Sequence, residues 1–376
     1  TKVGVNLGGA ARSVLNFCRD NKIPVRGHVL VWHSQTPGWF FKEDYTKEGA
    51  WVDKETMLAR MENYISGVMA VLAKEYPDVD FYAWDVVNEA WLDNGSPREG
   101  GMYDDNPNQS GWTQVFGDNS FIPYAFEYAR KYAPEGCKLY YNDFNEYMPD
   151  KTTAIVNMAN ELKERNLIDG IGMQSHLDVT FPSVSAYRKA LAAFAATGLD
   201  IQVTELDATT SDLSKQGFET QAQYYSDIMD AIVEYKDNIS AVVFWGTTDD
   251  MSWRAEKSPL LFNRDYTAKP AFYSIIDGID YNQPDTTGDT TESTASSDET
   301  TEPTPGTGVS LYGDVDLNGT VNIMDVILLN RSLMIGAKIE PQGMVNADVD
   351  DSGSADATDS LNILKAVVQL ITLPVQ

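Results

Sequence analysis

The first 280 residues alternate between two hydrophobic patterns. Short apolar runs, rich in β-branched and aromatic residues, are each followed by a segment in which apolar residues recur every three or four positions. Runs of this length indicate buried strands, and the periodic segments indicate amphipathic helices. We predict strands at 25–32, 81–88, 138–142, 170–175, 200–207 and 241–245, and helices at 12–21, 54–76, 120–132, 151–166, 183–196, 217–236 and 269–277. Strict alternation predicts an α/β fold with a parallel sheet and helices outside it.

Two architectures fit this alternation, a doubly wound sheet and a (β/α)8 TIM barrel. A doubly wound nucleotide-binding sheet requires a glycine-rich turn between its first strand and helix, and no such turn is present. The informative polar residues lie instead at the C-terminal ends of the predicted strands, where barrels carry their active sites. We therefore expect a TIM barrel, of which six β/α units are present in this sequence.

Two of these strand ends carry a glutamate. The run FYAWDVVNEAW places Glu89 directly after a strand buried on both faces, and DIQVTELD places Glu205 at the end of another strand. An ionised carboxylate is costly to bury without a partner, so the pattern favours a chemical role. Two carboxylates that face one cleft suit cleavage of a glycosidic bond, in which one donates a proton and the other is nucleophile or base. For Glu89 alone, a surface position in a loop is the alternative.

Histidines and tryptophans gather at the same strand ends. All three histidines of the chain, His28, His33 and His176, lie there. A single histidine is more often an ordinary core or surface residue, but three at one end of a barrel indicate a site. Trp253 lies in the polar loop DDMSWRAE, where a core position is less natural. An aromatic face beside a carboxylate pair suits stacking on sugar rings.

The charge balance limits the partners. The 376 residues include 56 acidic and 28 basic side chains, a formal net charge of −28, which disfavours nucleic acid and anionic membrane surfaces. This charge is compatible with a secreted, extracellular protein that acts on a neutral polymer. No run of about 20 apolar residues is present, so we predict no membrane span. The first residues lack a signal-peptide pattern, so we expect a trimmed or processed chain. Cys18 and Cys137 are expected to be free thiols.

Five motifs in order at these strand ends make a family resemblance specific. VRGHVLVWHSQTP, WDVVNEA, QSHL, VTELD and the late tryptophan pair resemble glycoside hydrolase family 10, the endo-β-1,4-xylanases, over residues 12–279. The resemblance implies hydrolysis of internal β-1,4-xylosidic bonds in xylan or xylo-oligosaccharides, with retention of anomeric configuration and without a catalytic cofactor. It implies that Glu89 is the general acid/base and that Glu205 is the nucleophile.

The same resemblance implies supporting roles for nine further residues. Asn88 would bind the sugar 2-hydroxyl, His176 would hold the nucleophile, and Asp207 would orient His176. The other implied substrate-binding residues are His28, Trp32 and Gln35 on the glycone side, Gln174, and the pair Trp245 and Trp253. The tryptophan pair would wall the central subsite and leave little room for a C5 hydroxymethyl group. A β-1,4-glucanase of the same clan is an alternative.

One departure from the family pattern bears on activity. The family has two further strands before the predicted strand 25–32, and this sequence begins inside the helix that follows them. The lysine and asparagine that the second strand supplies to the glycone subsites are therefore not in this sequence. We expect strands 25–32 and 241–245 to present open edges. An inactive fragment whose working part is the C-terminal region is thus a further alternative.

The composition changes after residue 280. Residues 281–310 are dominated by Thr, Ser, Pro and acidic side chains and contain no basic residue. Such a segment cannot bury a core, and its charges repel one another. We therefore predict three parts: a catalytic domain at 1–280, a linker at 281–310 and a separate module at 311–376.

The C-terminal region contains a loop-helix repeat with an offset of 34 residues. Each copy carries oxygen-bearing side chains at the ligand positions of a calcium loop, glycine at position 6, and an apolar helix afterwards, with no helix predicted before the loop. The predicted ligands are Asp314, Asp316, Asn318, Thr320, Asn322 and Asp325 in the first loop, and Asp348, Asp350, Ser352, Ser354, Asp356 and Asp359 in the second. Because 311–376 contains neither His nor Cys, the set favours Ca²⁺ over Zn²⁺.

This duplication resembles a type I-like dockerin, a small all-α calcium-binding module. The resemblance implies two bound Ca²⁺ ions, a cohesin module of a scaffoldin as partner, and a secreted, cellulosome-associated protein. Loop positions 10 and 11, which set partner choice in that family, are Ile323-Met324 and Ala357-Thr358 and depart from the common Ser-Thr pair.

Overall fold

The chain divides into two compact units, Thr1–Pro284 and Asp285–Gln376. The computed structural model describes residues 4–276, 311–335, 338–367 and 371–375, and we treat each unit by itself. The predicted linker 281–310 lies outside the described residues. None of the described helices is long and apolar enough to cross a membrane.

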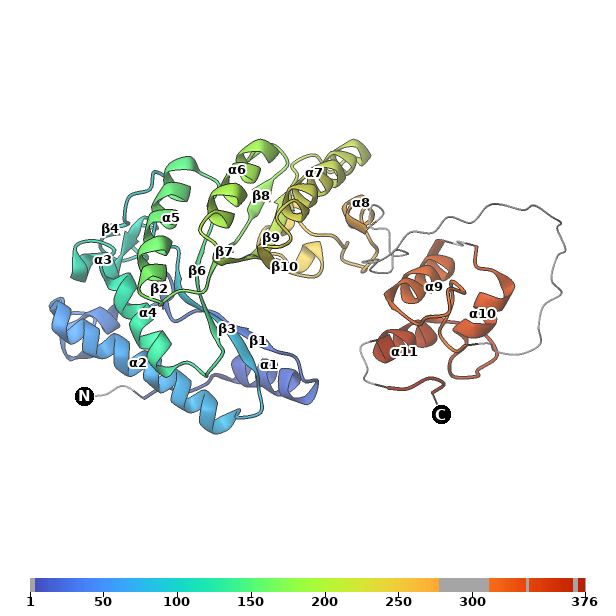
Figure 1. Ribbon diagram of the computed structural model, residues 1–376, viewed down its shortest axis with the longest axis horizontal. Helices are drawn as coiled ribbons and strands as arrows, with labels where there is room; N and C mark the ends of the chain where they lie inside the picture. The colour runs from blue at the N-terminus through green and yellow to red at the C-terminus, as the bar shows by residue number, and fades with distance from the viewer. Residues whose placement is uncertain (1–3, 277–310, 336–337, 368–370, 376) are drawn as a thin grey trace, which may run out of the picture. The chain divides into compact units, whose positions relative to one another are not determined.

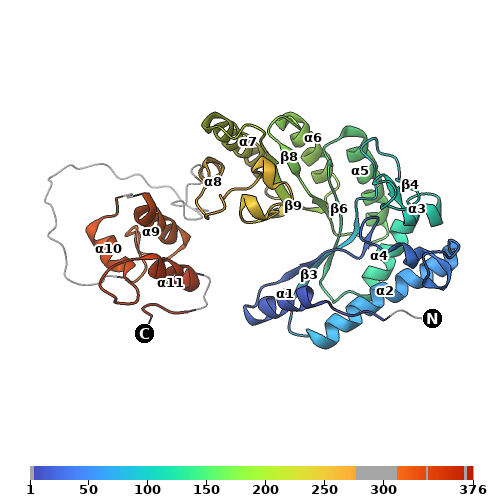
Figure 2. The ribbon, with the colours of Figure 1, turned by 180° about the vertical axis from the view of Figure 1, so that it is seen from behind.

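A curled parallel sheet forms the centre of the N-terminal unit (Figures 1 and 2). Its strands follow the order β1 (Val25–Gly27), β3 (Phe81–Asn88), β6 (Lys138–Asp143), β7 (Gly170–Met173), β9 (Asp200–Thr209) and β10 (Ile239–Phe244). Two short strands lie off this path: β2 (Val31–Trp32) pairs with β3, and β8 (His176–Asp178) pairs with β9. All these pairings are parallel, as the alternating pattern predicts.

Helices cover the outer side of the sheet, and α4 to α7 follow one another along it in Figure 1. The helices of this unit are α1 (Gly9–Asp20), α2 (Lys54–Glu75), α3 (Gly111–Phe116), α4 (Phe121–Tyr132), α5 (Pro149–Glu164), α6 (Val184–Ala195), α7 (Lys215–Val233) and α8 (Pro270–Ile276). Short 3-10 helices lie at η1 (Gly38–Phe41), η2 (Glu43–Tyr45), η3 (Asp249–Met251) and η4 (Ala255–Lys257). Asp53 caps α2 by accepting a hydrogen bond from the Thr56 N–H, a role for which aspartate is among the preferred residues.

The sheet is open in the described part of the chain. β1 pairs only with β3 along this path, and β10 pairs only with β9, so the six units form a half-barrel rather than a closed ring. Val243 on β10 is exposed, in contrast to the fully buried Val203 on β9. The predicted open edges at the first and last strands are therefore present.

Three local predictions were wrong in extent. The predicted strand 25–32 is two strands, because residues 28–30 leave the ladder between β1 and β2. The predicted strand 170–175 ends at Met173, and the chain resumes pairing at His176 after Ser175 takes a left-handed conformation with φ 59°. The region 91–117, in which no strand or helix is predicted, contains α3 and the small pair β4 (Glu99–Gly100) and β5 (Gln109–Ser110). Helix α3 is too short to show a hydrophobic period.

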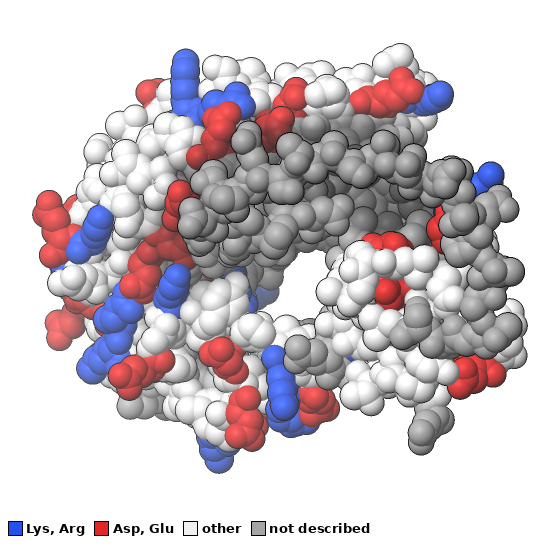
Figure 3. Space-filling view, turned by 45° about the vertical axis from the view of Figure 1, so that its right-hand side comes forward, with Lys and Arg blue, Asp and Glu red and all other residues white. Residues whose placement is uncertain are grey.

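Acidic and basic side chains lie interspersed over the visible face of the N-terminal unit in Figure 3. Some charged side chains of this unit form ion pairs, such as Arg130 with Asp169 and Lys131 with Glu62. Cys18 and Cys137 are free, as predicted, and Cys137 is buried.

In its described residues, the C-terminal unit is a small all-α module with three helices, α9 (Ile323–Ile335), α10 (Pro341–Ala347) and α11 (Ala357–Val367). The buried apolar residues described there form one core cluster: Val315, Val326, Leu329, Ala347, Val349 and Ile363. The expectation that no helix precedes either loop was wrong for the second loop, because α10 ends directly before Asp348. With seven residues and Pro341 at its start, α10 shows no readable apolar period.

The close approach of β1 to a tryptophan provides a test of this packing. A Cβ atom at Gly27 would overlap the indole ring of the buried Trp84. We expect Gly27→Ala to lower the free energy of unfolding by about 2 kcal/mol, since a packed core resists added volume. Gly9→Ala is the matched control, because a Cβ atom there meets nothing within 4 Å. Chemical denaturation of the two variants measures the difference, and equal stabilities would contradict the packing.

Candidate active site

Glu89 lies immediately after β3, with a left-handed φ of 57°. Its backbone N–H donates to the Asn142 carbonyl, at 2.9 Å. The carboxylate accepts two hydrogen bonds, from Trp32 Nε1 to Oε2 at 2.9 Å and from Gln174 Nε2 to Oε1 at 2.9 Å. The end of β6 therefore holds the backbone of Glu89, and residues at the ends of β2 and β7 hold its carboxylate.

The surroundings of Glu89 favour its protonated form. Burial is the largest influence and raises the pKa of Glu89, and repulsion from Asp143 adds to it. The hydrogen bonds from Gln174 and Trp32 act in the opposite direction but do not cancel the effect of burial. A carboxyl group with a raised pKa is suited to donate a proton.

Glu205 lies in β9 and is held by other groups. Asn142 Nδ2 donates to its Oε1 at 2.9 Å, and His176 Nε2 lies 3.1 Å from its Oε2. Both Glu205 and Asn142 are buried. An amide N–H and an imidazole therefore contact one oxygen each and fix the orientation of this carboxylate.

His176 connects Glu205 to a second carboxylate. Its Nδ1 lies 3.0 Å from Asp207 Oδ2, and Asp207 also accepts from Trp253 Nε1 at 3.1 Å and from Arg254 Nη1 at 2.7 Å. Burial lowers the pKa of His176, but the hydrogen bonds to Asp207 and Glu205 outweigh it and raise this pKa to about 9. At neutral pH His176 is therefore a cation beside Glu205.

Two amides join the two carboxylates into one network. Gln174 Nε2 contacts both Glu89 and Asn88 Oδ1, the latter at 3.1 Å, and Asn142 Nδ2 contacts both Glu205 and Asn88 Oδ1, the latter at 3.0 Å. Asn88 Oδ1 thus accepts from both sides, which leaves its own amide N–H groups out of the network and available to a ligand.

A cleft of about 1140 Å³ opens onto these residues. Both glutamates line it, together with all eight predicted substrate-binding residues: His28, Trp32, Gln35, Asn88, Gln174, His176, Trp245 and Trp253. Trp253 is 65% exposed and Trp245 is 41% exposed, so both indole rings offer surface to a ligand. Asp207 does not line the cleft, because it is completely buried behind His176.

The three histidines differ in their environments. His28 Nδ1 lies 3.0 Å from Asp85 Oδ2; burial lowers its pKa, but contacts with Asp85 outweigh this and raise it. His33 is buried, and burial, with Arg98 and Lys151 nearby, lowers its pKa to about 2. Of the three histidines, His28 and His176 line the cleft and His33 does not. The inference that the histidines belong to one site therefore applies to two of them.

Three residues of the site were missing from the predicted set. Asn142, at the end of β6, contacts Asn88 and Glu205; its position in the run YYND carries the same strand-end signal as Glu89. Arg254 pairs with Asp207, and its place beside Trp253 is the only sequence signal for it. Arg98 donates from Nε to the Glu89 carbonyl at 2.6 Å, and no motif pointed to it.

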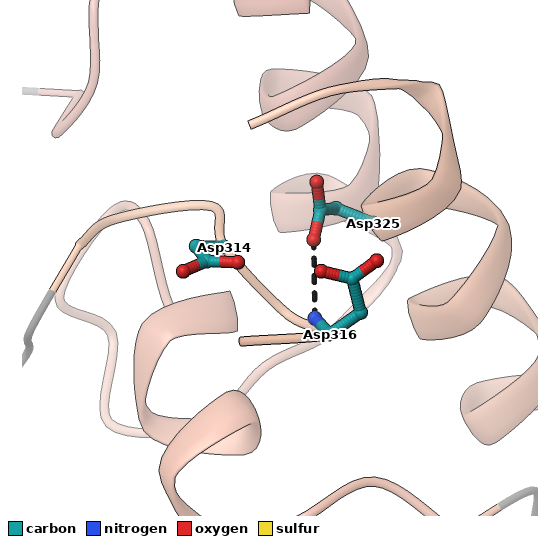
Figure 4. Close-up of side chains that lie close together, drawn as sticks. All are labelled: Asp314, Asp316 and Asp325. Carbon is teal, nitrogen blue, oxygen red and sulfur yellow. Dashed lines mark hydrogen bonds between the residues drawn. The ribbon is translucent and has the colours of Figure 1, made fainter. Parts of the chain in front are cut away.

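The C-terminal unit brings the predicted carboxylates together in two sets. Asp314, Asp316 and Asp325 form one set, and Asp348, Asp350 and Asp359 the other; within each, one oxygen per residue lies within 4.8 Å of the others. Figure 4 shows the first set converging from the loop and the start of α9, with Asp316 N–H donating to Asp325 at 3.1 Å. Asp314 Oδ1 is buried without a hydrogen-bond partner among the described residues.

These two sets fit a hard cation. Three carboxylate oxygens around one point are the donors that Ca²⁺ prefers, and the orphaned Asp314 oxygen lacks a compensating partner. Burial raises the pKa of Asp325 and of Asp359. The other six predicted ligands are not in the carboxylate sets; Asn318 Oδ1, for example, accepts from the Thr320 N–H at 2.9 Å.

An open parallel sheet with paired glutamates at its strand ends defines a glycoside-hydrolase type of site. The family model for glycosyl hydrolase family 10 matches residues 6–278, and the model for the dockerin type I domain matches residues 312–368. The chain belongs to glycosyl hydrolase family 10 and carries a dockerin type I domain.

Several curated relatives support this assignment. The chain is 46% identical over 272 residues to the bifunctional endo-1,4-beta-xylanase XylA of Ruminococcus flavefaciens, covering 72% of this chain and 27% of the relative. It is 42% identical over 291 residues to endo-1,4-beta-xylanase Y of Acetivibrio thermocellus, covering 73% and 27%. The chain thus spans about a quarter of the length of these two relatives.

Solved structures show the same fold. The Clostridium thermocellum endo-1,4-beta-D-xylanase 10B, complexed with xylohexaose, aligns with a TM-score of 0.67 at 41% identity, over 71% of this chain and 54% of that chain. An intracellular xylanase from Thermoanaerobacterium saccharolyticum aligns with a TM-score of 0.66 at 33% identity, over 73% and 83%.

The raised pKa of His176 predicts a pH dependence of stability. A histidine whose folded-state pKa is about 9, against an ordinary value near 6.5, stabilises the fold fully below pH 6.5 and loses this contribution as the pH rises through 9. We expect the free energy of unfolding to fall between pH 7 and 9 by about 2 kcal/mol, and His176→Gln to remove most of this slope. Urea unfolding across this range measures it, and parallel curves for both proteins would contradict the imidazolium between Glu205 and Asp207.

Proposed function

We propose that the N-terminal unit hydrolyses internal β-1,4-xylosidic bonds of xylan or xylo-oligosaccharides with retention of anomeric configuration. The observation that carries this proposal is the pair Glu89 and Glu205, which line one cleft from two strand ends. Burial raises the pKa of Glu89, whereas Glu205 is held by His176 and Asn142. Environments that separate two carboxyl groups in this way assign the acid and the nucleophile.

The two glutamates act in sequence in this mechanism. Protonated Glu89 donates its proton to the glycosidic oxygen while a Glu205 oxygen attacks the anomeric carbon, so the glycosidic bond breaks and a glycosyl ester forms. Glu89, now ionised, then takes a proton from water, which attacks the anomeric carbon and releases Glu205. This double displacement requires carboxyl groups about 5–5.5 Å apart.

The remaining cleft residues orient the sugar in this proposal. Asn88 has amide N–H groups outside the carboxylate network and is placed to bind the 2-hydroxyl. His176 holds Glu205, and Asp207 with Arg254 holds His176. The exposed rings of Trp245 and Trp253 supply stacking surfaces. His28, Trp32, Gln35 and Gln174 line the same cleft and complete the proposed substrate contacts.

Xylan is the preferred substrate class over cellulose. The relatives are named endo-1,4-beta-xylanases, and one structural neighbour is complexed with xylohexaose. In this proposal, the walls formed by Trp245 and Trp253 exclude the hydroxymethyl group that distinguishes glucose from xylose. Side-by-side assays on xylan and carboxymethyl-cellulose test this: turnover on cellulose alone identifies a glucanase, and no turnover on either overturns the activity.

For the C-terminal unit we propose two bound Ca²⁺ ions and a cohesin module of a scaffoldin as partner. The support is the match to the dockerin type I domain and the two carboxylate sets. Bound calcium would neutralise the clustered carboxylates and cross-link each loop to its helix. Attachment to a scaffoldin places the protein outside the cell, in a cellulosome, with residues 1–280 as catalytic domain, 281–310 as linker and 311–376 as dockerin.

The roles of the two glutamates predict different responses to substitution. We expect Glu205→Ala to abolish hydrolysis, because no nucleophile replaces the carboxylate. We expect Glu89→Ala to retain activity on an aryl xylobioside with an activated leaving group when azide is present, because azide can occupy the vacated space and attack the intermediate. Product NMR should show a β-xylosyl azide with Glu89→Ala and the β-anomer first with the unaltered protein. An α-anomer as first product would contradict retention.

Calcium should govern folding of the C-terminal unit. Its small apolar core is insufficient to offset repulsion among six clustered carboxylates. We therefore expect the full chain to lose helix content in EDTA and to regain it on adding Ca²⁺, with about two ions bound per chain. Asp325→Ala with Asp359→Ala should abolish this response and cohesin capture while leaving xylan hydrolysis unchanged. Circular dichroism that is indifferent to EDTA would show that the carboxylates hold no structural calcium.

A further inference from the structure

A completely buried carboxyl group lies behind the cleft, on Glu146 in the loop after β6. Its Oε1 accepts a hydrogen bond from Ser175 Oγ at 3.0 Å, and Ser175 Oγ lies 2.8 Å from the Tyr187 hydroxyl on α6. Glu146 Oε2 has no hydrogen-bond partner in the part of the chain that the structure describes. Glu146 does not line the cleft, and the mechanism above does not use it.

Ser175, the hydrogen-bond partner of Glu146, lies between two residues that contact the glutamates of the cleft. Ser175 lies between Gln174, whose amide holds Glu89, and His176, whose imidazole holds Glu205. It joins β7 to β8 in a left-handed conformation, with φ 59°, which an L-residue other than glycine adopts only when its surroundings impose it. The backbone on both sides is bonded to β9, through Glu205 N–H to the Gln174 carbonyl and Asp207 N–H to the Ser175 carbonyl.

Packing alone does not account for a carboxyl group at this position. Burial raises the pKa of Glu146 to about 7, with attraction by Lys151 opposing and repulsion by Asp143 adding to the effect. An apolar side chain of similar size would fill the same volume without that desolvation cost. What the carboxyl group supplies is an acceptor for the single hydroxyl proton of Ser175, which leaves the Ser175 oxygen free to accept from Tyr187.

We propose that Glu146 is a positioning residue for both catalytic carboxylates: by anchoring Ser175 it sets the directions of Gln174 and His176, and through them those of Glu89 and Glu205. These contacts form one series, from Glu146 to Ser175 and from the two neighbours of Ser175 to the two glutamates. This inference rests on the proposed function of those glutamates, and it adds a common support for both of them.

Kinetics on an aryl xylobioside test the proposal in the full chain. Glu146→Ala should lower kcat by about 100-fold with a smaller change in KM, since a displacement of catalytic groups on the order of 1 Å costs this much. Ser175→Ala should give a similar loss, and the double variant should lose no more than either single variant, because the residues act as a unit. Glu146→Gln keeps the acceptor oxygen and should restore kcat to within a few-fold. Glu161→Ala, on the exposed face of α5, is the matched control.

A second readout does not depend on activity. The chain contains only three histidines, so the imidazole signals can be followed by NMR as the pH is raised. His176 faces Glu205 and Asp207 on β9, with Arg254 behind Asp207. In Glu146→Ala the midpoint of the His176 titration should move from about 9 towards that of an ordinary histidine, and Glu146→Gln should move it back.

The two readouts separate this proposal from the proposed function. If the unaltered protein hydrolyses no xyloside, the proposed function fails, and the His176 titration still decides the role of Glu146. An unchanged His176 midpoint in Glu146→Ala overturns the proposal, as does a loss of kcat that Glu146→Gln does not restore. A loss that merely follows the folded fraction, with the titration of the folded molecules unchanged, assigns Glu146 to stability alone and likewise overturns it.

Discussion

Charged groups buried at the ends of parallel strands must be paired, and this constraint organises the whole N-terminal unit. Glu89, Asp143, Glu205 and Asp207 all lie where β3, β6 and β9 reach the cleft, and repulsion among them is uncompensated unless cations or N–H donors intervene. The structure places at least one such group beside each: an indole and an amide for Glu89, Lys151 for Asp143, His176 for Glu205, and Arg254 for Asp207.

The two glutamates have hydrogen-bond partners of different charge. Glu89 receives neutral donors, which cannot offset its burial, so it keeps its proton to higher pH. Glu205 receives a cationic imidazole whose own charge is stabilised by Asp207. Asn88 accepts hydrogen bonds from Gln174, which contacts Glu89, and from Asn142, which contacts Glu205. One hydrogen-bond network therefore connects the two carboxylates, although their electrostatic surroundings differ. The two carboxyl groups of one cleft therefore differ in their surroundings.

The architecture and the two glutamates could be predicted from the sequence because buried parallel strands are continuous apolar runs that stop abruptly. The links between strand ends could not be predicted in this way. Asn142 contacts Asn88 because β3 and β6 pair in a register that places Asn88 opposite Asn142, and register is a property of packing between elements distant in sequence. Arg254 reaches Asp207 from an irregular segment, which has no period at all. Short helices such as α3 and α10 are fixed by local caps and a proline rather than by a repeating apolar pattern.

In the described residues of the C-terminal unit, backbone N–H groups rather than ion pairs meet the same constraint. Asp325 accepts hydrogen bonds from the N–H groups of Val315, Asp316 and Asn322, and Asp359 repeats this arrangement with Val349, Asp350 and Asp356. Each aspartate therefore closes its loop onto the following helix while it faces two further carboxylates. Backbone N–H groups donate hydrogen bonds to the carboxylate oxygens but carry no net charge. They therefore do not remove the repulsion among the three carboxylates of each set. The residues that shape each loop are thus also those whose carboxylates repel one another, so the geometry of the loop and its charge repulsion depend on the same side chains.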